Sequence, residues 1–527
     1  MAGLVSESRR AWQRQMLLGA APLLFIVAWA VLPVARLMGE GWSSVQTGGL
    51  DLWWSPWTDG YLRWRMQWSL LQAGLTTLLA TVLGVPVAWV LARTAFVGRD
   101  WVVRSLMLPF VVPTLVAALG VLALWGPRGS LGLSLADSPV LLILGNLFFN
   151  LCLMVRGAMG GLAQVSASRL AAARSLGATP WRAFWRLEWP TARNAVAAAA
   201  CLVFLYCLTG FGLALLLGGA KWSTAEVEIY TLVAYDLELG AASVLALWML
   251  VLAGSVGVLY AGLGVRGRDR LKADAIPLRP ARSWRTRCGL AAALLTLLVF
   301  NYGPLLALVW RATVAGSAAW AHAWSPSAGL ALINTLRFCA MGLVLAGVLG
   351  VLHGMVGARS AVWRSLGMVP LVVSPVMVAF GLLLLWPAYL DTLAVLVCAY
   401  ALLALPLVAA PVAQAVQTVP AAWVEAARTL GASPARAFWR VVWPHLRAGA
   451  RRGLAFAAAT MLGEFAVTLL LSRPEWLTLS TYIYQLLGRP GELNAQAAWV
   501  MSATLMVLSL LAFVLIEPST REGGRHA

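Results

Sequence analysis

The chain carries the stretch EAARTLGASPARAFWRVVWP at residues 425–444 and a second version of it, AAARSLGATPWRAFWRLEWP, at residues 171–190. The two copies lie 254 positions apart and are identical at 14 of their 20 positions. The apolar segments that flank the copies match each other far less well. Because this polar, basic stretch repeats better than the apolar segments around it, we expect it to perform one task twice.

Each copy is predicted to form two short helices joined by a sharp turn. The residues before Gly431 favour a helix, and glycine commonly ends a helix because it adopts positive φ without strain. Ser433 and Pro434 fit the N-cap and the first position of the next helix. Proline is then expected to end that helix, at Pro444 here and at Pro190 in the first copy. A single copy would also fit an amphipathic hairpin on a membrane surface, but the duplication argues against this alternative.

The repeated pattern resembles the EAA loop of type I ABC importer permeases, in which a coupling helix docks into a groove on a cytoplasmic ATPase. The resemblance implies ATPase contacts for the matching residues of both copies. These are Ala172, Ala173, Leu176 and Gly177 in the first copy, and Glu425, Ala426, Ala427, Leu430 and Gly431 in the second.

The two copies differ at the first position of the motif. The first copy has Ala171 where the family motif has glutamate, whereas the second copy has Glu425. We expect Glu425 in the first turn of its helix, where a carboxylate gains about 0.3–1 kcal/mol from the helix dipole. Contact with the ATPase is therefore predicted to be asymmetric, with a charged contact from the second copy only.

The composition places the chain in a membrane. Of its 527 residues, 61% are hydrophobic and 11% are charged, whereas about a quarter of the residues of a soluble protein are charged. We therefore predict an all-α polytopic membrane protein that contacts membrane lipid. The net charge of +19, from 39 basic and 20 acidic residues, indicates basic cytoplasmic loops and not binding to nucleic acid.

A membrane span needs about 20 mostly apolar residues, and by this measure the sequence predicts about twelve transmembrane helices. The predicted spans are residues 16–38, 67–92, 103–125, 139–157, 195–217, 240–264, 288–310, 332–356, 366–387, 391–413, 450–471 and 495–516.

The spans fall into two permease halves of six. We expect a first half at residues 1–265, a charged cytoplasmic linker at 266–287, a second half at 288–516 and a cytoplasmic tail at 517–527. Weaker matches outside the loops follow the same order in both halves. Because the two halves run the same way across the membrane, the repeat is predicted to be parallel. Arginines gather in alternate loops, so both termini and both repeated loops are predicted on the cytoplasmic side of a bacterial inner membrane.

The sequence lacks the residues of an enzyme. It has no phosphate-binding loop of the G-x-x-x-x-G-K-[ST] type, and no paired carboxylates, metal-ligand cluster or Ser/His/Asp set stands out. We therefore predict a non-enzymatic subunit without catalytic residues, bound metal or cofactor. Its ATPase would be a separate subunit in two copies, one under each loop.

Two polar residues inside predicted spans are candidates for a translocation path. Glu464 is costly in a membrane unless it is paired or faces water. The alternative is that it packs against a polar loop at the outer end of its span. Asn150 is the second candidate, and its alternative is a bridge between helices.

Two fused permease halves suggest the thiamine or the ferric iron importers. The chain resembles the permeases for thiamine and thiamine pyrophosphate more closely and over nearly its full length. Outside the loops the resemblance rests on GPRGSLG at 126–132, LGNLFFNL at 144–151, EVEIYTLVAYDLELGAASVLAL at 226–247 and TLSTYIYQLLG at 478–488. It implies a periplasmic binding protein that delivers the vitamin. A ferric iron permease is the alternative, and a secondary transporter or a membrane-embedded enzyme are alternatives from other classes.

Overall fold

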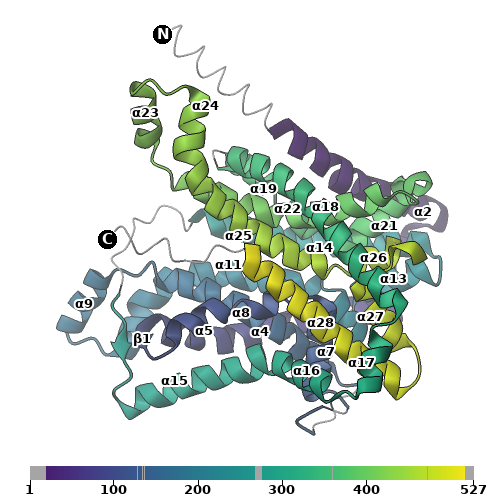
Figure 1. Cartoon of the computed structure of the whole chain (residues 1–527), viewed down its shortest axis with the longest axis horizontal. Coiled ribbons are helices and arrows are strands. Elements are labelled where there is room, and N and C mark those ends of the chain that lie inside the picture. Colours follow the sequence, from purple (N-terminus) through teal and green to yellow (C-terminus); the bar gives the residue numbers. More distant parts are fainter. Residues whose placement is uncertain are drawn as a thin grey trace. The chain divides into compact units, whose positions relative to one another are not determined.

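A computed structural model of the chain is helical almost throughout (Figure 1). It describes residues 19–127, 129–132, 135, 137–266, 276–358, 360–471 and 473–516. The predicted tail at 517–527 and residues 267–275 of the predicted linker lie outside this part of the chain.

The described residues form two compact units that do not coincide with the two halves of the sequence. One unit consists of residues 44–317, and the other combines residues 19–43 with residues 318–516. The first helical segment of the chain therefore packs with helices of the second half. Helix α16 (Gly303–Val314), which belongs to the second half, packs in turn with helices of the first.

The described residues of the unit 44–317 form fourteen α-helices, two π-helical segments, η2 and η3, and two very short strands. In chain order its elements are α3 (Leu50–Thr58), α4 (Gly60–Arg93), β1 (Thr94–Ala95), α5 (Arg99–Ser105), α6 (Leu108–Val111), α7 (Thr114–Trp125), α8 (Pro139–Leu162), α9 (Ala167–Ser175), α10 (Pro180–Ala183), η2 (Phe184–Glu188), α11 (Trp189–Leu208), α12 (Gly212–Leu217), α13 (Ala225–Ala234), α14 (Leu239–Arg266), β2 (Arg279–Pro280), α15 (Trp284–Leu297), η3 (Leu298–Tyr302) and α16.

The second unit, with the two helices α2 and α17 that reach its boundary, is also helical. Its elements are η1 (Val27–Val31), α2 (Leu32–Gly48), α17 (Ser317–Ala323), α18 (Pro326–Gly357), α19 (Ala361–Leu366), α20 (Val369–Val372), α21 (Pro375–Leu385), η4 (Pro387–Tyr389), α22 (Leu393–Gln417), α23 (Ala421–Thr429), α24 (Pro434–Ala437), η5 (Phe438–Val442), α25 (Trp443–Leu462), α26 (Ala466–Leu471), η6 (Pro474–Trp476), α27 (Leu479–Gly488) and α28 (Glu492–Ile516).

Nine helices of the described chain are long and apolar enough to cross a membrane, and up to eleven if each of two bent helix pairs counts as one span. One of the twelve predicted spans, residues 450–471, is not among these eleven, and the structure has two helices there. The long member, α25, begins with a basic segment that contains Arg447, Arg451 and Arg452. Its charge explains why length and composition do not mark it as a span.

Prolines bend two of the predicted spans. The helices of the span at 103–125 meet at 107°, and those of the span at 366–387 meet at 88°. A residue that precedes proline is disfavoured in the helical region. Val112 and Ser374 precede the two prolines and are extended, with ψ of 137° and 153°. Neither span is therefore the straight single helix that hydrophobicity alone predicts.

Two more predicted spans, 195–217 and 450–471, are each divided into a long and a short helix. Thr209 ends α11 with φ of −94° and ψ of 7°, and Gly463 ends α25 with φ of −99° and ψ of 6°. These residues are 254 positions apart, the spacing of the repeated stretch. The same break thus occurs at the same place in both halves.

Loops predicted between spans contain buried helices, which are held alike in the two halves. The hydroxyl of Ser69 accepts the N–H of Ala225 at the start of α13, at 2.8 Å. The hydroxyl of Thr335 accepts the N–H of Leu479 at the start of α27, also at 2.8 Å. Because a buried N–H group needs an acceptor, each hydroxyl fixes the start of its helix. This matching detail supports a repeat of the same fold in the two halves.

The described C-terminal part of the predicted linker forms backbone hydrogen bonds with a strand of the first half. Residues 279–280 form β2, which pairs in parallel with β1 through Thr94 opposite Arg279 and Ala95 opposite Pro280. Helix α15 starts four residues later.

Candidate functional site

The turn in the first repeated stretch is a Schellman motif, a helix end closed by two hydrogen bonds around a left-handed residue. Gly177 follows α9 with φ of +79°. Its N–H donates to the carbonyl of Arg174 at 3.0 Å, and the N–H of Ala178 donates to the carbonyl of Ala173 at 3.0 Å. The local chain therefore reverses where glycine is placed.

The second stretch repeats this turn. Gly431 has φ of +81°, and its N–H donates to the carbonyl of Arg428 at 3.0 Å. The N–H of Ala432 donates to the carbonyl of Ala427 at 3.0 Å. The predicted positive φ at the glycine is confirmed in both copies.

The predicted cap of the following short helix is also confirmed. The hydroxyl of Ser433 accepts the N–H of Arg436 at 3.3 Å, and Pro434 opens α24. In the first copy, Thr179 accepts the N–H of Arg182 at 3.3 Å ahead of α10. Each stretch is thus a hairpin of two helices, and in Figure 1 the hairpin of α23 and α24 extends beyond the end of α25.

The prediction that proline ends the second helix is wrong. The helix runs from Pro180 without a break to Leu208. Proline lacks an N–H and its ring clashes with the carbonyl four residues earlier. The wider π-turn of η2 precedes Pro190, and there the N–H of Trp189 bonds to the carbonyl of Phe184, five residues back. The same arrangement occurs at η5 in the second copy. Each short helix and its long neighbour therefore form one continuous rod.

Glu425 is not in the first turn of its helix, contrary to the prediction. Helix α23 begins at Ala421 and has no acidic residue in its first turn. Its carboxylate is therefore too far from the helix start to gain from the dipole, which acts mainly within the first turn. The side chain is exposed, and only a contact with a partner could give it a role.

The turns present apolar side chains to the surroundings. Leu176 is 89% exposed and Leu430 is 88% exposed. Ala172 and Ala426 are exposed as well, and they leave a low face beside each leucine. The remaining predicted residues share this surface: Ala173 and Ala427 are half-buried, and Gly177 and Gly431 are exposed. The predicted residues of each copy are thus exposed or half-buried around the turn, and none of them is fully buried.

A buried carboxylate holds the first loop, and the sequence analysis missed it. Oε2 of Glu188 accepts hydrogen bonds from Nε1 of Trp89 at 3.1 Å and from Nε of Arg93 at 3.2 Å. Nη2 of Arg93 lies 3.1 Å from the same oxygen and also donates to the carbonyl of Leu162 at 3.1 Å. Glu188 is only 2% exposed. The pair joins η2 to the ends of α4 and α8.

A comparison of the two copies of the repeat could have drawn attention to Glu188. Glu188 occupies one of the six positions at which the two copies differ, and the second copy has Val442 there. A carboxylate that replaces an apolar residue in an apolar environment requires a partner. Its partner, Arg93, lies 95 positions away, and no local pattern links the two residues.

The two predicted path residues make local contacts. The carboxylate of Glu464 accepts the N–H of Val467 at 3.0 Å, at the start of α26. Nδ2 of Asn150 donates to the carbonyl of Asn146 at 2.9 Å and to Sγ of Cys207 at 3.4 Å. These contacts are those of a helix cap for Glu464 and of a bridge between α8 and α11 for Asn150. A path role for either residue stays a prediction.

Comparison with known proteins identifies the family. The model of the binding-protein-dependent transport system inner membrane component matches residues 80–266 and 342–521. Each match contains one of the two hairpins. The chain belongs to this family. Its predicted all-α, polytopic membrane fold is confirmed.

Individual relatives match along most of their length. The chain is 27% identical to the thiamine transport system permease protein ThiP of Escherichia coli (strain K12), over 95% of each chain. It is 26% identical to the protein of that name from Haemophilus influenzae, over 91% of this chain and 93% of the relative. A crystal structure of a bacterial ABC transporter involved in alginate import matches 50% of this chain and 98% of that chain, at 15% identity and a TM-score of 0.42.

Proposed function

We propose that this chain is the membrane-spanning permease of an ABC importer that carries thiamine, with thiamine pyrophosphate as a second candidate substrate. The observation that carries the proposal is the pair of exposed hairpins, each with a leucine at its turn, in a chain without a phosphate-binding loop. The family of binding-protein-dependent permeases and the relatives named for thiamine transport support it.

The proposal includes two kinds of partner. A cytoplasmic ATPase would dock on both hairpins, in two copies, and a periplasmic binding protein would deliver the vitamin on the opposite side. Both termini and both hairpins would then be cytoplasmic, since arginines cluster on their side of the predicted spans. The chain would lie in the bacterial inner membrane, and its two permease halves would be those of the sequence, 1–265 and 288–516.

The continuous rods suggest how docking is transmitted. Each hairpin leads without a break into α11 or α25. A displacement of the hairpin by the ATPase would therefore move a long helix directly. The contact residues would be those on the exposed faces, namely Ala172, Ala173, Leu176 and Gly177, and Glu425, Ala426, Ala427, Leu430 and Gly431. Glu464 and Asn150 are the proposed path residues.

The transported substrate can be tested with the assembled importer. We expect the purified complex of permease, ATPase and binding protein to hydrolyse ATP faster when the binding protein carries thiamine than when it is empty. The measurement is phosphate release in proteoliposomes, with thiamine pyrophosphate and ferric iron as parallel ligands. Stimulation by the ferric-loaded protein alone would replace this assignment with a ferric iron permease. Uptake without ATP would indicate a secondary transporter.

The asymmetry of the hairpins gives a second test. We expect Glu425→Ala to weaken ATPase association, because a charge-assisted hydrogen bond at a partly buried contact contributes about 1.5–3 kcal/mol. Ala171→Glu is the matched variant, and it should be tolerated or strengthen association. Transport and ATPase co-purification should be measured for both single variants and for the double variant. Wild-type behaviour of Glu425→Ala in both assays would show that docking rests on the apolar faces alone.

A further inference from the structure

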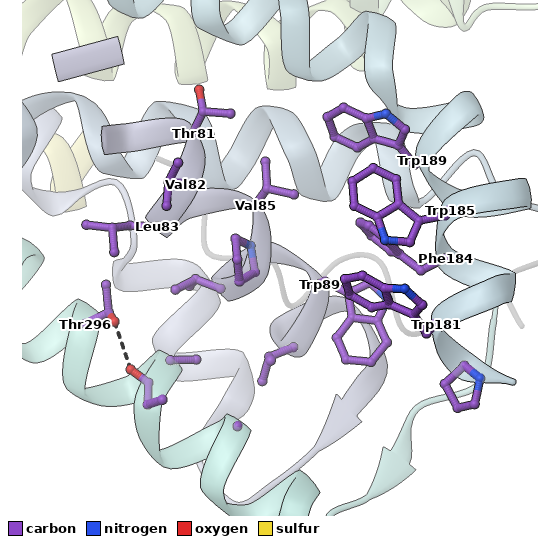
Figure 2. A pocket seen from close by; sticks show the side chains of 17 residues that line it. Thr81, Val82, Leu83, Val85, Trp89, Trp181, Phe184, Trp185, Trp189 and Thr296 are labelled. Atoms are coloured by element: carbon purple, nitrogen blue, oxygen red, sulfur yellow. Dashed lines mark hydrogen bonds between the residues drawn. The ribbon is translucent and has the colours of Figure 1, made fainter. Parts of the chain in front are cut away.

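A large cavity lies beside the first hairpin, within the unit of residues 44–317. Its volume is about 830 Å³, and it is walled by α4, by the segment from α10 to the start of α11, and by α15. Figure 2 shows the aromatic side chains on one wall, and Thr81, Val82 and Leu83 away from them. The labelled aromatic residues are Trp89, Trp181, Phe184, Trp185 and Trp189.

The cavity is suited to a hydrocarbon chain. Its lining is aliphatic and aromatic apart from two threonines. The hydroxyl of Thr81 donates to the carbonyl of Thr77 at 2.7 Å, and that of Thr296 donates to the carbonyl of Ala292 at 2.9 Å. Both hydroxyls are thus engaged in their own helices. A polar ligand would lose its hydration there without gaining comparable hydrogen bonds.

The helices and tryptophans around the cavity are typical of the interface between the hydrocarbon core and the headgroups of a membrane. All three walls belong to helices that are long and apolar enough to span it, namely Gly60–Arg93, Pro180–Leu208 and Trp284–Val314. The lining residues lie toward the end of each helix that is nearest the hairpin. Tryptophan is enriched where the hydrocarbon meets the headgroups. Lipid chains are therefore the abundant apolar molecules at this opening.

Positive charge lies at the same end. Arg182 and Arg186 follow two tryptophans of the wall and are exposed, as is Arg285. Arg285 is four residues before Gly289, so both lie on one face of α15. Among the described residues of α10, η2 and α15, the acidic side chain is that of Glu188, and it is paired with Arg93. The exposed arginines are thus available to an anion, as in basic pockets that bind anionic lipid headgroups.

We propose that this cavity binds one acyl chain of an anionic membrane phospholipid, with its headgroup beside Arg182, Arg186 and Arg285. The lipid would support the first hairpin, whose Trp181 and Trp185 form part of the wall. The second copy has Ala435 in place of Trp181, so the lipid contact is a property of the first loop. This site does not depend on which substrate is transported.

The test uses full-length permease in vesicles of phosphatidylcholine with a small fraction of phosphatidylglycerol that carries a photoreactive diazirine on one acyl chain. After irradiation, labelled peptides are mapped by mass spectrometry. We expect label in residues 81–90, 180–189 and 289–296. Arg182→Gln and Arg186→Gln should each lower labelling about fivefold, because an arginine near an anionic surface contributes about that factor.

A filling variant tests the cavity itself. A Cβ added at Gly289 would meet nothing within 4 Å, so Gly289→Leu is compatible with the backbone and places a side chain in the cavity. We expect about tenfold less labelling, as for the displacement of about two methylene groups. Gly254→Leu is the matched control, since Gly254 has equal space and does not line the cavity. It should label like the wild type.

Three results would overturn the proposal. Equal labelling by the same diazirine chain on phosphatidylcholine would show that the site has no preference for an anionic headgroup. If the Gly289→Leu variant is folded, as measured by thermal unfolding, and is labelled as strongly as the wild type, the lipid chain does not bind in this cavity. If none of the three peptides is labelled, no lipid chain binds there. As a further control, Trp185→Ala should reduce labelling and its counterpart Trp439→Ala should not.

Discussion

Glu188→Val is expected to destabilise the permease by about 3–5 kcal/mol, the usual cost of removing one partner from a buried ion pair. The change leaves Arg93, whose side chain is only 11% exposed, without its carboxylate, and leaves the indole N–H of Trp89 without its acceptor. Segment η2 would no longer be held against the ends of α4 and α8. We therefore expect a lower midpoint of thermal unfolding for the purified permease and a loss of ATPase co-purification.

A double variant separates the charge from the packing. Valine is already present at the matching position of the second copy, Val442, so its shape is compatible with a π-turn of this kind. Replacing both members of a buried ion pair by apolar residues is often close to neutral. Glu188→Val combined with Arg93→Leu should therefore recover much of the lost stability. If the single variant keeps the wild-type midpoint and co-purification, the pair does not position the loop.

Gly431→Val should uncouple transport while the protein still inserts into the membrane. The glycine has φ of +81°, and a side chain there would meet nothing within 4 Å. The penalty therefore comes from the backbone, at about 1–3 kcal/mol for a residue other than glycine, and β-branched residues are the least tolerant of this region. Relieving the strain would change the direction of α24. Transport and ATPase association should fall, as measured in vesicles and by co-purification.

Asparagine provides the matched control at this turn. It is among the residues that adopt the left-handed region most readily, so Gly431→Asn should retain far more activity than Gly431→Val. Gly177→Val should resemble Gly431→Val, since Gly177 has φ of +79° and equal space. Equal loss with valine and asparagine would indicate that the backbone angle is not the cause. Failure of membrane insertion would argue for a folding role and against a coupling role.

Local features of the hairpins were predictable from the residues. The glycine turn, the serine cap and the proline at the start of α24 depend on bonds between residues at most five positions apart. Such bonds are determined by the φ preferences and side-chain acceptors of the residues that form them. The membrane class followed from composition for a similar reason, since apolar content needs no knowledge of partners.

Two predictions were wrong because a rule for a single residue was applied without regard to the neighbouring residues. Proline was expected to end a helix, but a single π-turn before Pro190 accommodates it and the rod continues. Glu425 was assigned to the first turn of its helix because the motif begins there, whereas α23 starts four residues earlier. Propensity does not mark a helix start sharply, because several flanking residues can continue the helix.

The sequence by itself determined the membrane class, the repeat and the two hairpin turns. The tertiary structure decided which helices pack into each compact unit, that Glu188 meets Arg93, and that α4, α10 and α15 enclose a cavity. The ion pair and the three walls of the cavity join residues about 90 or more positions apart. Apolar helices are interchangeable in pattern, because hydrophobic burial has no direction. Their pairing is therefore decided only when side chains fit together in the folded chain.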